Sequence, residues 1–462
     1  MFGHRIVLAL IGTLSCLPQA WGDSSNSASL YRPATSGWAI QFAQNGLAGA
    51  ASLDPQVNDR PLVWGAGRHA PGTGFYVPCC RDPLSTTGPA TARIPHDRAW
   101  FIRNHPDWLV YSAPTATTPS TGGGAGNLWA VDIANPTVQQ YMLAYALGQC
   151  PAADVYPTCR TDLPADLLAR RRGGHAYVSL DNLAAYNAAE IRGHFVGAVP
   201  GCPAGEPACG GTWVQRYTGS QLDQAYADDI FRYTRFLKAG LNAKGVGLWT
   251  NNKVNKRDVR NSATLASIGD ASLSESAFLH ACRAGVTTFV SGMDEGSDWY
   301  SRLQVSNAVY GKQVVVQFNY LCGHPVSEAS AAEIAYATAN YYLTRDEHTY
   351  FEMQNGSSVG RQDVGRRITY PSSMMVNLGR PTEPPPAAGK PNSSGGCYQR
   401  SFERGMVVVW PSDAGSCTYT VPPGGQWADQ FGNPVHDGVN TLQSDTSTSV
   451  ARANAIVIVK SD

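Results

Sequence analysis

Short apolar runs alternate with longer amphipathic stretches over most of this chain. Eight runs have the length and the β-branched or aromatic content of buried strands. They are Leu62 to Gly65, Trp108 to Ser112, Leu128 to Ile133, Ala176 to Leu180, Val246 to Thr250, Ala271 to Ser274, Val314 to Phe318 and His348 to Phe351. Strands that alternate with helices form parallel βαβ units, and eight such units close into a barrel. The pattern therefore predicts an α/β fold, a (β/α)8 TIM barrel, with an open doubly wound sheet as the alternative.

The stretches between these runs carry helix signals. Asn135 followed by Pro136 is an N-cap residue with a proline in the first turn, and it predicts a helix that ends near Leu147. Apolar residues at helical spacing predict further helices. These are Gln221 to Ala243, Asp258 to Ile268, Trp299 to Val309 and Ala331 to Leu343.

The pattern changes towards the C-terminus. Residues 380–396 are rich in Pro, Gly and Ser and are not expected to hold a regular element. Beyond them, short β-rich runs separated by turn residues predict a small antiparallel β domain. These runs are Met406 to Trp410, Thr418 to Val421 and Ala455 to Val459. We therefore divide the chain into a signal peptide (1–22), a barrel (23–375) and a C-terminal β-sandwich domain (376–462).

The N-terminus has the features of an export signal. His4 and Arg5 give a weakly basic start, an apolar run extends from Ile6 to Leu17, and Ala20-Trp21-Gly22 fits a cleavage site. The apolar run is too short to cross a membrane, and no later run is long enough to do so. We therefore expect a secreted or periplasmic protein without a membrane span.

The cysteines agree with export. Eleven are present, and without Cys16 of the signal peptide an even number remains, which in an exported chain indicates disulfides. Short separations favour the pairs Cys150–Cys159, Cys202–Cys209 and Cys397–Cys417. Cys79, Cys80, Cys282 and Cys322 would form two more bridges in an order that stays open. The chain has no Cys-x-x-Cys pair and no His pair at the helical spacing of metal ligands, so we expect neither a metal nor another cofactor.

The charge balance narrows the classes of ligand. The chain has 35 basic and 35 acidic residues, so it lacks the basic surplus that binding to nucleic acid requires. Charged residues make up only 15% of the chain, while Gly, Pro, Tyr and Trp are plentiful. Such a surface suits neutral hydrophilic ligands better than ionic ones. The oligomeric state stays open.

Polar side chains follow the predicted strands at their carboxyl ends, where barrel enzymes carry their active sites. They are Asp132, Asp181, Asn182, Asn251, Asn252, Glu275, Gln317, Asn319, Tyr320 and Glu352, with Trp129 and Trp249 close by. Carboxylates and amides bind sugar hydroxyl groups, and aromatic faces stack on sugar rings. Two carboxyl groups that flank one bond are the minimum apparatus for hydrolysis of a glycoside.

Several of these residues also have a structural interpretation. Asp181 would serve as the N-cap of a following helix, and Asp132 would fix the corner between a strand and a helix. Glu275 fits a surface turn, Asn251 and Asn252 fit turn positions, and Trp249 fits the core.

The order of several runs resembles a known family. NHPDWLVYS, LWAVDIANPTVQQYM, AYVSLDN, LSESAF and VVVQFNY, followed by NLGRP and RSFERGMVVVWPSD, resemble the bacterial proteins of hypothetical glycosyl hydrolase family 15. They are similar, more distantly, to glycoside hydrolase family 114 and to the α-galactosidase-like barrels. The likeness extends from Leu62 to the C-terminus. It implies that Asp181 is the nucleophile and that Glu275 is the acid/base. The long Cys-bearing segment 199–212, the many cysteines and Trp410, which stands where an Asn is usual, depart from the family pattern.

We therefore expect a secreted glycoside hydrolase that cleaves O-glycosidic bonds of a polysaccharide or oligosaccharide, with Asp181 and Glu275 as a catalytic pair and retention favoured. The expected substrate-binding residues are Asp132, Asn182, Trp249, Asn251, Asn252, Gln317, Asn319, Tyr320 and Glu352. One alternative is a non-catalytic carbohydrate-binding protein on a barrel scaffold. Another is a metal-dependent hydrolase such as a deacetylase, although His175, His280 and His348 are too scattered to suggest its ligands.

Overall fold

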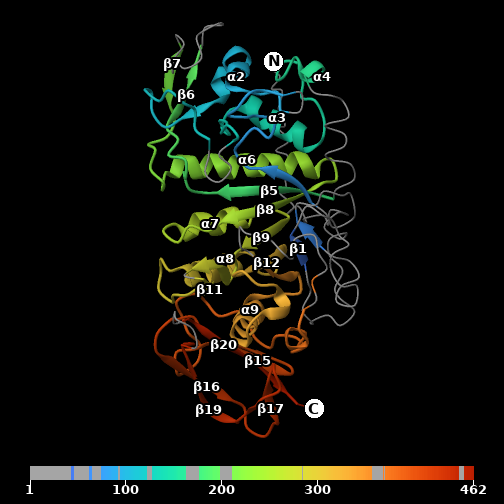
Figure 1. The fold of residues 1–462 in the computed structure, drawn as a ribbon, viewed down its shortest axis with the longest axis vertical. Coiled ribbons are helices and arrows are strands. Elements are labelled where there is room, and N and C mark those ends of the chain that lie inside the picture. Colours follow the sequence, from blue (N-terminus) through green and yellow to red (C-terminus); the bar gives the residue numbers. More distant parts are fainter. Residues whose placement is uncertain are drawn as a thin grey trace, which may run out of the picture.

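A parallel sheet of six strands forms the centre of the computed structural model (Figure 1). Its order is β13 (Thr349–Asn355), β12 (Val314–Leu321), β9 (Ala271–Glu275), β8 (Gly247–Lys253), β5 (Tyr177–Ala184) and β3 (Gly74–Pro78). All neighbouring strands in it are parallel. The structure describes residues 43–45, 62–64, 74–91, 94–121, 127–162, 176–197, 211–283, 285–355, 368, 370–446 and 452–461. The predicted signal peptide and the predicted pair Cys202–Cys209 lie outside the described residues.

A second parallel pair lies against both edges of this sheet. It consists of β1 (Ala43–Asn45) and β2 (Leu62–Trp64), which hydrogen-bond to each other. β2 contacts β3, and β1 contacts β13.

Two of the predicted strands do not belong to the parallel sheet. The run Trp108 to Ser112 contributes only β4 (Val110–Tyr111), which pairs antiparallel with β6 (Gly193–Val196) outside the parallel sheet. β6 in turn pairs with β7 (Thr212–Gln215). The run Leu128 to Ile133 makes only isolated bridges, through Ala130 and Val131. Both runs are apolar because they pack into the core, while most of their backbone hydrogen bonds go to loops.

The five predicted helices are confirmed. They are α3 (Pro136–Ala146), α6 (Gln224–Asn242), α7 (Val259–Ala266), α8 (Asp298–Val309) and α9 (Ala331–Thr344). Side chains of Asn135, Asp223, Asp258 and Ser330 accept hydrogen bonds from backbone N–H groups of the first turns of α3, α6, α7 and α9. The shorter elements are α2 (Arg98–Asn104), α4 (Cys159–Asp162), η1 (Pro106–Trp108), η2 (Val326–Glu328), η3 (Ser372–Met374), β10 (Leu279–Arg283) and β11 (Val286–Phe289). Across the described ranges, no helix has the length and apolar character needed to cross a membrane.

The predicted antiparallel domain at the C-terminus is confirmed. One sheet has the order β14 (Tyr398–Phe402), β15 (Gly405–Trp410), β20 (Asn454–Lys460), β17 (Trp427–Asp429) and β18 (Pro434–Val435). The other pairs β16 (Ser416–Val421) with β19 (Gly438–Gln443). Side chains alternate along β15. Met406 and Val408 pack in one cluster with residues of β16 and β19, while Val407 and Val409 pack in the cluster that contains α9. α9 therefore lies between the parallel sheet and this domain (Figure 1).

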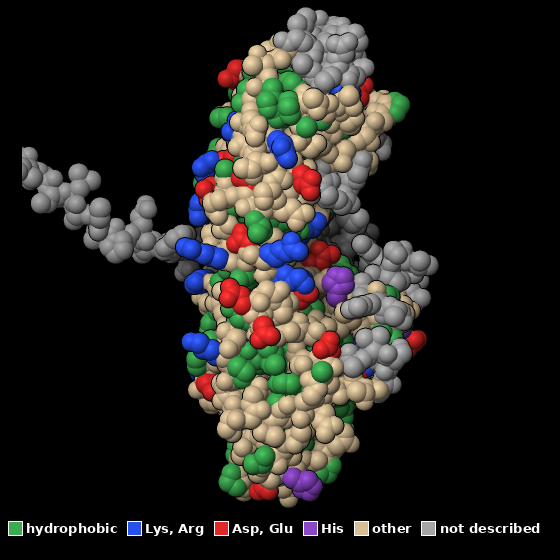
Figure 2. Space-filling model, turned by 90° about the vertical axis from the view of Figure 1, so that its left-hand side faces the viewer, with side chains coloured by type: hydrophobic (Ala, Val, Ile, Leu, Met, Phe, Trp, Pro, Cys, Tyr) green, Lys and Arg blue, Asp and Glu red, His purple; other side chains and the backbone are tan. Residues whose placement is uncertain are grey.

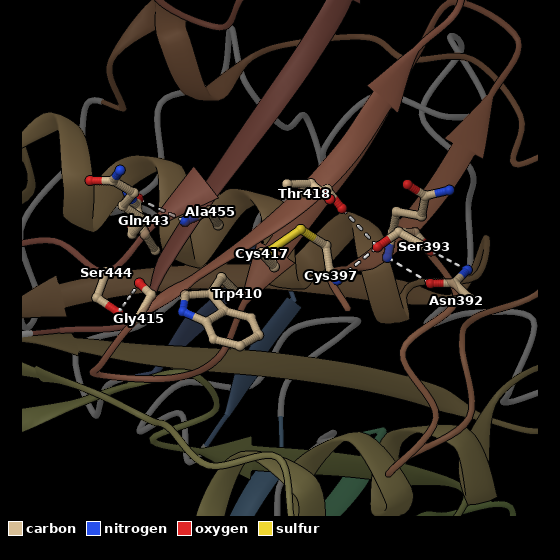
Figure 3. The surroundings of a disulfide bond; sticks show 12 residues. Asn392, Ser393, Cys397, Trp410, Gly415, Cys417, Thr418, Gln443, Ser444 and Ala455 are labelled. Carbon is tan, nitrogen blue, oxygen red and sulfur yellow. Dashed lines mark hydrogen bonds between the residues drawn. A yellow bond between two sulfur atoms is a disulfide. The ribbon is translucent and has the colours of Figure 1, made fainter. Parts of the chain in front are cut away.

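Four disulfides lie within the described residues. Cys150–Cys159 and Cys397–Cys417 confirm two predicted pairs. The four cysteines whose pairing the sequence left open join as Cys79–Cys80 and Cys282–Cys322. Cys397–Cys417 connects the residue before β14 to β16, so it links the two sheets of the C-terminal domain (Figure 3).

The fully buried Arg400 joins β14 to the end of α9. Its Nη1 donates to the backbone oxygens of Tyr342, Leu343 and Arg345, at 3.1, 3.3 and 2.6 Å. Its Nη2 donates to the hydroxyl of Tyr310 at 2.9 Å. The last carbonyls of a helix have no partner within the helix, and the negative end of the helix dipole favours a cation there. Arg400 therefore supplies both the hydrogen bonds and the charge that this helix end needs.

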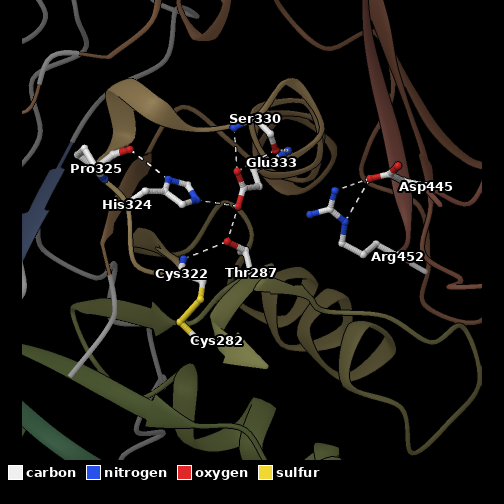
Figure 4. A network of polar contacts seen from close by, with 9 residues as sticks. All are labelled: Cys282, Thr287, Cys322, His324, Pro325, Ser330, Glu333, Asp445 and Arg452. Carbon is white, nitrogen blue, oxygen red and sulfur yellow. Dashed lines mark hydrogen bonds and ion pairs between the residues drawn. A yellow bond between two sulfur atoms is a disulfide. The ribbon is translucent and has the colours of Figure 1, made fainter. Parts of the chain in front are cut away.

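A buried acid joins α9 to the strands around Cys282–Cys322 (Figure 4). Glu333 accepts hydrogen bonds from the side chains of Thr287 and Ser330, and His324 Nε2 lies 3.3 Å from its Oε1. Burial would raise the pKa of Glu333, but these hydrogen bonds outweigh burial and lower it to about 2.

The substitution Arg400→Met should destabilise the protein by about 3–5 kcal/mol, because buried carbonyl groups lose their donors. The measurement is the free energy of unfolding in guanidinium chloride. Arg404→Met, on the exposed side of the same β hairpin, is the matched control and should change little. A loss below about 1 kcal/mol in Arg400→Met would contradict this account.

The free energy of unfolding should fall as the pH drops from about 4.5, the ordinary pKa of Glu333, towards about 2, its pKa in the folded protein. The folded state holds this carboxylate ionised over that range while the unfolded chain takes up a proton, so the loss should be about 3 kcal/mol. Glu333→Gln should remove this part of the pH dependence. Glu295→Gln, in an exposed loop, should keep it. Equal pH profiles for the two variants would contradict the role given to Glu333.

Candidate active site

Three side chains meet at the carboxyl ends of neighbouring strands. Asp181 lies on β5, Asn251 on β8 and Glu275 at the end of β9. Because these strands are parallel neighbours, their carboxyl ends lie at one edge of the sheet. The arrowhead of β5 in Figure 1 points to the side that Figure 2 shows face on.

Asn251 bridges the two predicted catalytic acids. Its Nδ2 donates to Asp181 Oδ1 at 2.8 Å and to Glu275 Oε2 at 2.7 Å. A side-chain amide carries two N–H bonds, so one hydrogen serves each carboxylate. The two oxygens can be no farther apart than the sum of these distances. That bound fits the separation of about 5–5.5 Å found in retaining glycosidases and lies below the range of inverting ones.

Neutral donors hold the remaining carboxylate oxygens. Asp181 Oδ2 accepts from the Tyr76 hydroxyl at 2.7 Å and from Asn182 Nδ2 at 2.6 Å. Glu275 Oε1 accepts from the Tyr320 hydroxyl at 2.7 Å. Burial and the negative charge of Asp181 raise the pKa of Tyr76, so this hydroxyl keeps its proton and can donate. Both carboxylates are thus oriented by hydrogen bonds and, among the described residues, form no ion pair with a basic side chain.

The residue directly after each acid has a left-handed backbone conformation. Asn182 and Ser276, which directly follow Asp181 and Glu275, adopt positive φ values of 59° and 55°. Residues other than glycine rarely adopt this conformation, and strain of this kind is concentrated at functional sites. Asp181 does not cap a helix, since β5 continues to Ala184.

An open cavity of about 330 Å³ adjoins Glu275. Its lining comprises Tyr186, Asn251, Asn252, Lys253, Val254, Glu275, Ser276, His280 and Arg302. A smaller cavity of about 50 Å³ has walls that include Cys79, Cys80, Asn182 and four alanines. Tyr186 and Lys253 line both cavities, so the two are adjacent. Their combined space is of the size that small-molecule sites have.

Some predicted binding residues reach this site and others do not. Tyr320, Asn182 and Asn251 contact the two acids, and Asn252 lines the larger cavity. Trp249 is fully buried and packs edge-on against Tyr177, which matches its interpretation as a core residue.

Three others are buried within the sheet. Gln317 donates to Thr344, and Asn319 accepts from the backbone N–H groups of Phe278 and Leu279. Alternation along β12 places both on the face opposite to that of Tyr320. Glu352 is fully buried on β13.

Asp132 belongs to a different cluster. Its carboxylate lies 3.1 Å from His194 and 3.4 Å from Arg216, and its Oδ1 accepts from the backbone N–H of Ala134. These contacts fix the corner after the run Leu128 to Ile133. A substrate contact of Asp132 stays a prediction.

Several residues of the site were not identified from the sequence. Tyr76 lies on β3, and the sequence GFYVP looks like a loop because Gly and Pro flank its apolar residues. Arg302 lies on a helix, so the search at strand ends could not find it. Lys253 is the last residue of β8 and the disulfide Cys79–Cys80 directly follows β3, so their position at strand ends was an available signal. In the described part of the chain, no group of three or more His, Cys, Asp and Glu side chains could hold a metal ion.

No family model matches this chain, and neither does any curated protein. Solved structures similar to it include an α-amylase from Lactobacillus plantarum, 8% identical, covering 83% of this chain and 78% of that chain with a TM-score of 0.33. The trehalulose synthase MutB is 12% identical, with 84% of each chain covered and a TM-score of 0.38. A GH27 β-L-arabinopyranosidase from Geobacillus stearothermophilus is 9% identical, with 68% and 82% covered and a TM-score of 0.27. At these identities and TM-scores, nothing about the reaction of this chain follows from the likeness.

Proposed function

We propose that this protein is an exported glycoside hydrolase that cleaves O-glycosidic bonds of a polysaccharide or oligosaccharide with retention of configuration. The observation that carries the proposal is the amide of Asn251, which donates to one oxygen of Asp181 and one of Glu275 and so keeps these two oxygens close enough for a retaining pair. The adjoining cavity gives a sugar access to Glu275. The disulfides support export, because such bonds persist in oxidising compartments.

We also propose that β1 and β2 complete a closed (β/α)8 barrel. They contact the two edge strands of the six-stranded sheet, β13 and β3. Around such a barrel the strands follow one another in chain order, with β5 fourth and β9 sixth. These are the strands at which the family resemblance places the nucleophile and the acid/base.

In the proposed reaction, Asp181 attacks the anomeric carbon and the bond to the leaving oxygen breaks, which forms a glycosyl-enzyme. Glu275 gives its proton to the leaving oxygen and then takes a proton from the water that releases the sugar. Tyr76 and Asn182 hold the attacking carboxylate in one orientation. When Glu275 is protonated at Oε1, the hydroxyl of Tyr320 rotates to accept that proton's hydrogen bond.

Asp181→Asn should lower kcat by about 10⁴-fold or more, and Glu275→Gln by about 10²–10⁴-fold, because one removes the nucleophile and the other the proton donor. The measurement is release of reducing ends from a panel of polysaccharides, after the wild-type protein has identified its substrate. Asp294→Asn and Glu295→Gln, in an exposed loop, are the matched controls and should keep wild-type rates. Undiminished turnover in either active-site variant overturns the assignment. If wild-type protein binds sugars but hydrolyses none, the protein is a carbohydrate-binding protein instead.

The first product released should keep the anomeric configuration of the substrate, because double displacement inverts the carbon twice. Proton NMR of the anomeric region during the first minutes of hydrolysis measures it before mutarotation. The opposite anomer would show that water attacks directly, and Asp181 would then act as the base.

A further inference from the structure

The lining of the larger cavity carries more positive than negative charge. Glu275 is its one acidic side chain, whereas Lys253, Arg302 and the exposed His280 also line it. Lys253 ends β8 two residues after Asn251, so the two side chains share a face of the strand. Within the described ranges, the partly buried ammonium of Lys253 has neither a hydrogen bond nor an ion pair.

Arg302 also has N–H donors that are free to bind a ligand. This side chain on α8 reaches the site and donates from Nη1 to the backbone oxygen of Glu275 at 2.9 Å. A guanidinium has five N–H donors, and among the described residues this is its one hydrogen bond. Asp298, the nearest acid on the same helix, is exposed and lies 3.3 Å from Lys256. Glu275 is therefore the one acid of the cavity whose charge acts on Arg302.

The proposed mechanism increases this imbalance. Glu275 must be protonated, and so neutral, before it can act as an acid, which leaves the cations of Lys253 and Arg302 uncompensated in the cavity. Partly desolvated cations without an anion cost free energy, so a ligand that brings an anion gains affinity there. Lys and Arg side chains gather at mid-height on this face, at the level of α7 and α8, with acidic side chains among them (Figure 2).

We propose that the larger cavity binds a sugar ring that carries an anionic group, a carboxylate or a sulfate ester, with Lys253 and Arg302 as its partners. The inference rests on the proposed function, because that function sets the protonation of Glu275 and places the ring beside the bond to be cleaved. It replaces the expectation of a neutral ligand, which came from the composition of the whole chain, with one based on the charges of the cavity itself.

The test is calorimetric binding to the Asp181→Asn protein, which should not turn over the probes. The probes are oligogalacturonate against its methyl ester, and sulfated against unsulfated galactan oligosaccharides, so that the members of each pair share a sugar backbone and differ in charge. We expect at least one anionic probe to bind ten or more times tighter than its neutral counterpart. Its affinity should weaken with added salt, while that of the neutral probe should not. Whichever pair shows the difference identifies the anion.

In the Asp181→Asn protein, the further substitution Lys253→Met should weaken binding of that anionic probe about 10-fold or more, because a charge-assisted hydrogen bond is lost. The affinity for the neutral probe should stay unchanged. Lys244→Met, in the exposed turn after α6, is the matched control and should change neither. Arg302→Gln should act as Lys253→Met does, and thermal unfolding checks that each variant is folded. Equal affinity for charged and neutral probes, or no binding of any anionic probe, overturns the proposal.

The two proposals fail separately. If Asp181→Asn abolishes hydrolysis of a neutral polysaccharide and Lys253→Met does not affect it, the proposed glycosidase activity is supported and the proposed anionic substrate is contradicted. If the anionic probe binds through Lys253 but the wild-type protein hydrolyses no saccharide, the proposed anion site is supported and the proposed glycosidase activity is contradicted.

Discussion

The site depends on one side-chain amide held between two acids of like charge. Carboxylates as close as those of Asp181 and Glu275 repel each other, and the two hydrogens of Asn251 offset part of this repulsion. Asn251 is itself buried, and its Oδ1 has no hydrogen-bond partner among the described groups, so the side chain serves the site as a donor. This geometry exists because β5, β8 and β9 are parallel neighbours. A shift of β8 by one residue would turn Asn251 to the other face and leave the acids without their bridge.

Much of the fold could be predicted from the sequence where a strand is a continuous apolar run. β8 and β12 are buried on both faces, and their composition shows it. β3 escaped prediction because its short apolar core lies between Gly74 and Pro78. The run Leu128 to Ile133 was predicted as a strand but is not one. Its residues are apolar because they are buried, and burial makes a segment apolar whatever its backbone pairs with.

The candidate site could be predicted only as far as strand ends define it. That rule found Asp181, Asn251 and Glu275. It also selected Gln317 and Asn319, because it does not say which of two alternating faces points to the site. Tyr76 and Arg302 come from a strand and a helix that the rule did not cover. The left-handed conformation of Ser276 has no sequence signal, since serine does not favour it.

The contact of Arg400 with the end of α9 bears on how the two parts of the molecule relate in evolution and engineering. A module appended through a linker can be exchanged or removed without harm to its neighbour. Here the C-terminal domain contributes the group that terminates a helix of the other part. Recombination that separates α9 from β14 would give two incomplete halves, so the pair should be inherited as one unit, and any chimera should keep both on the same parental segment.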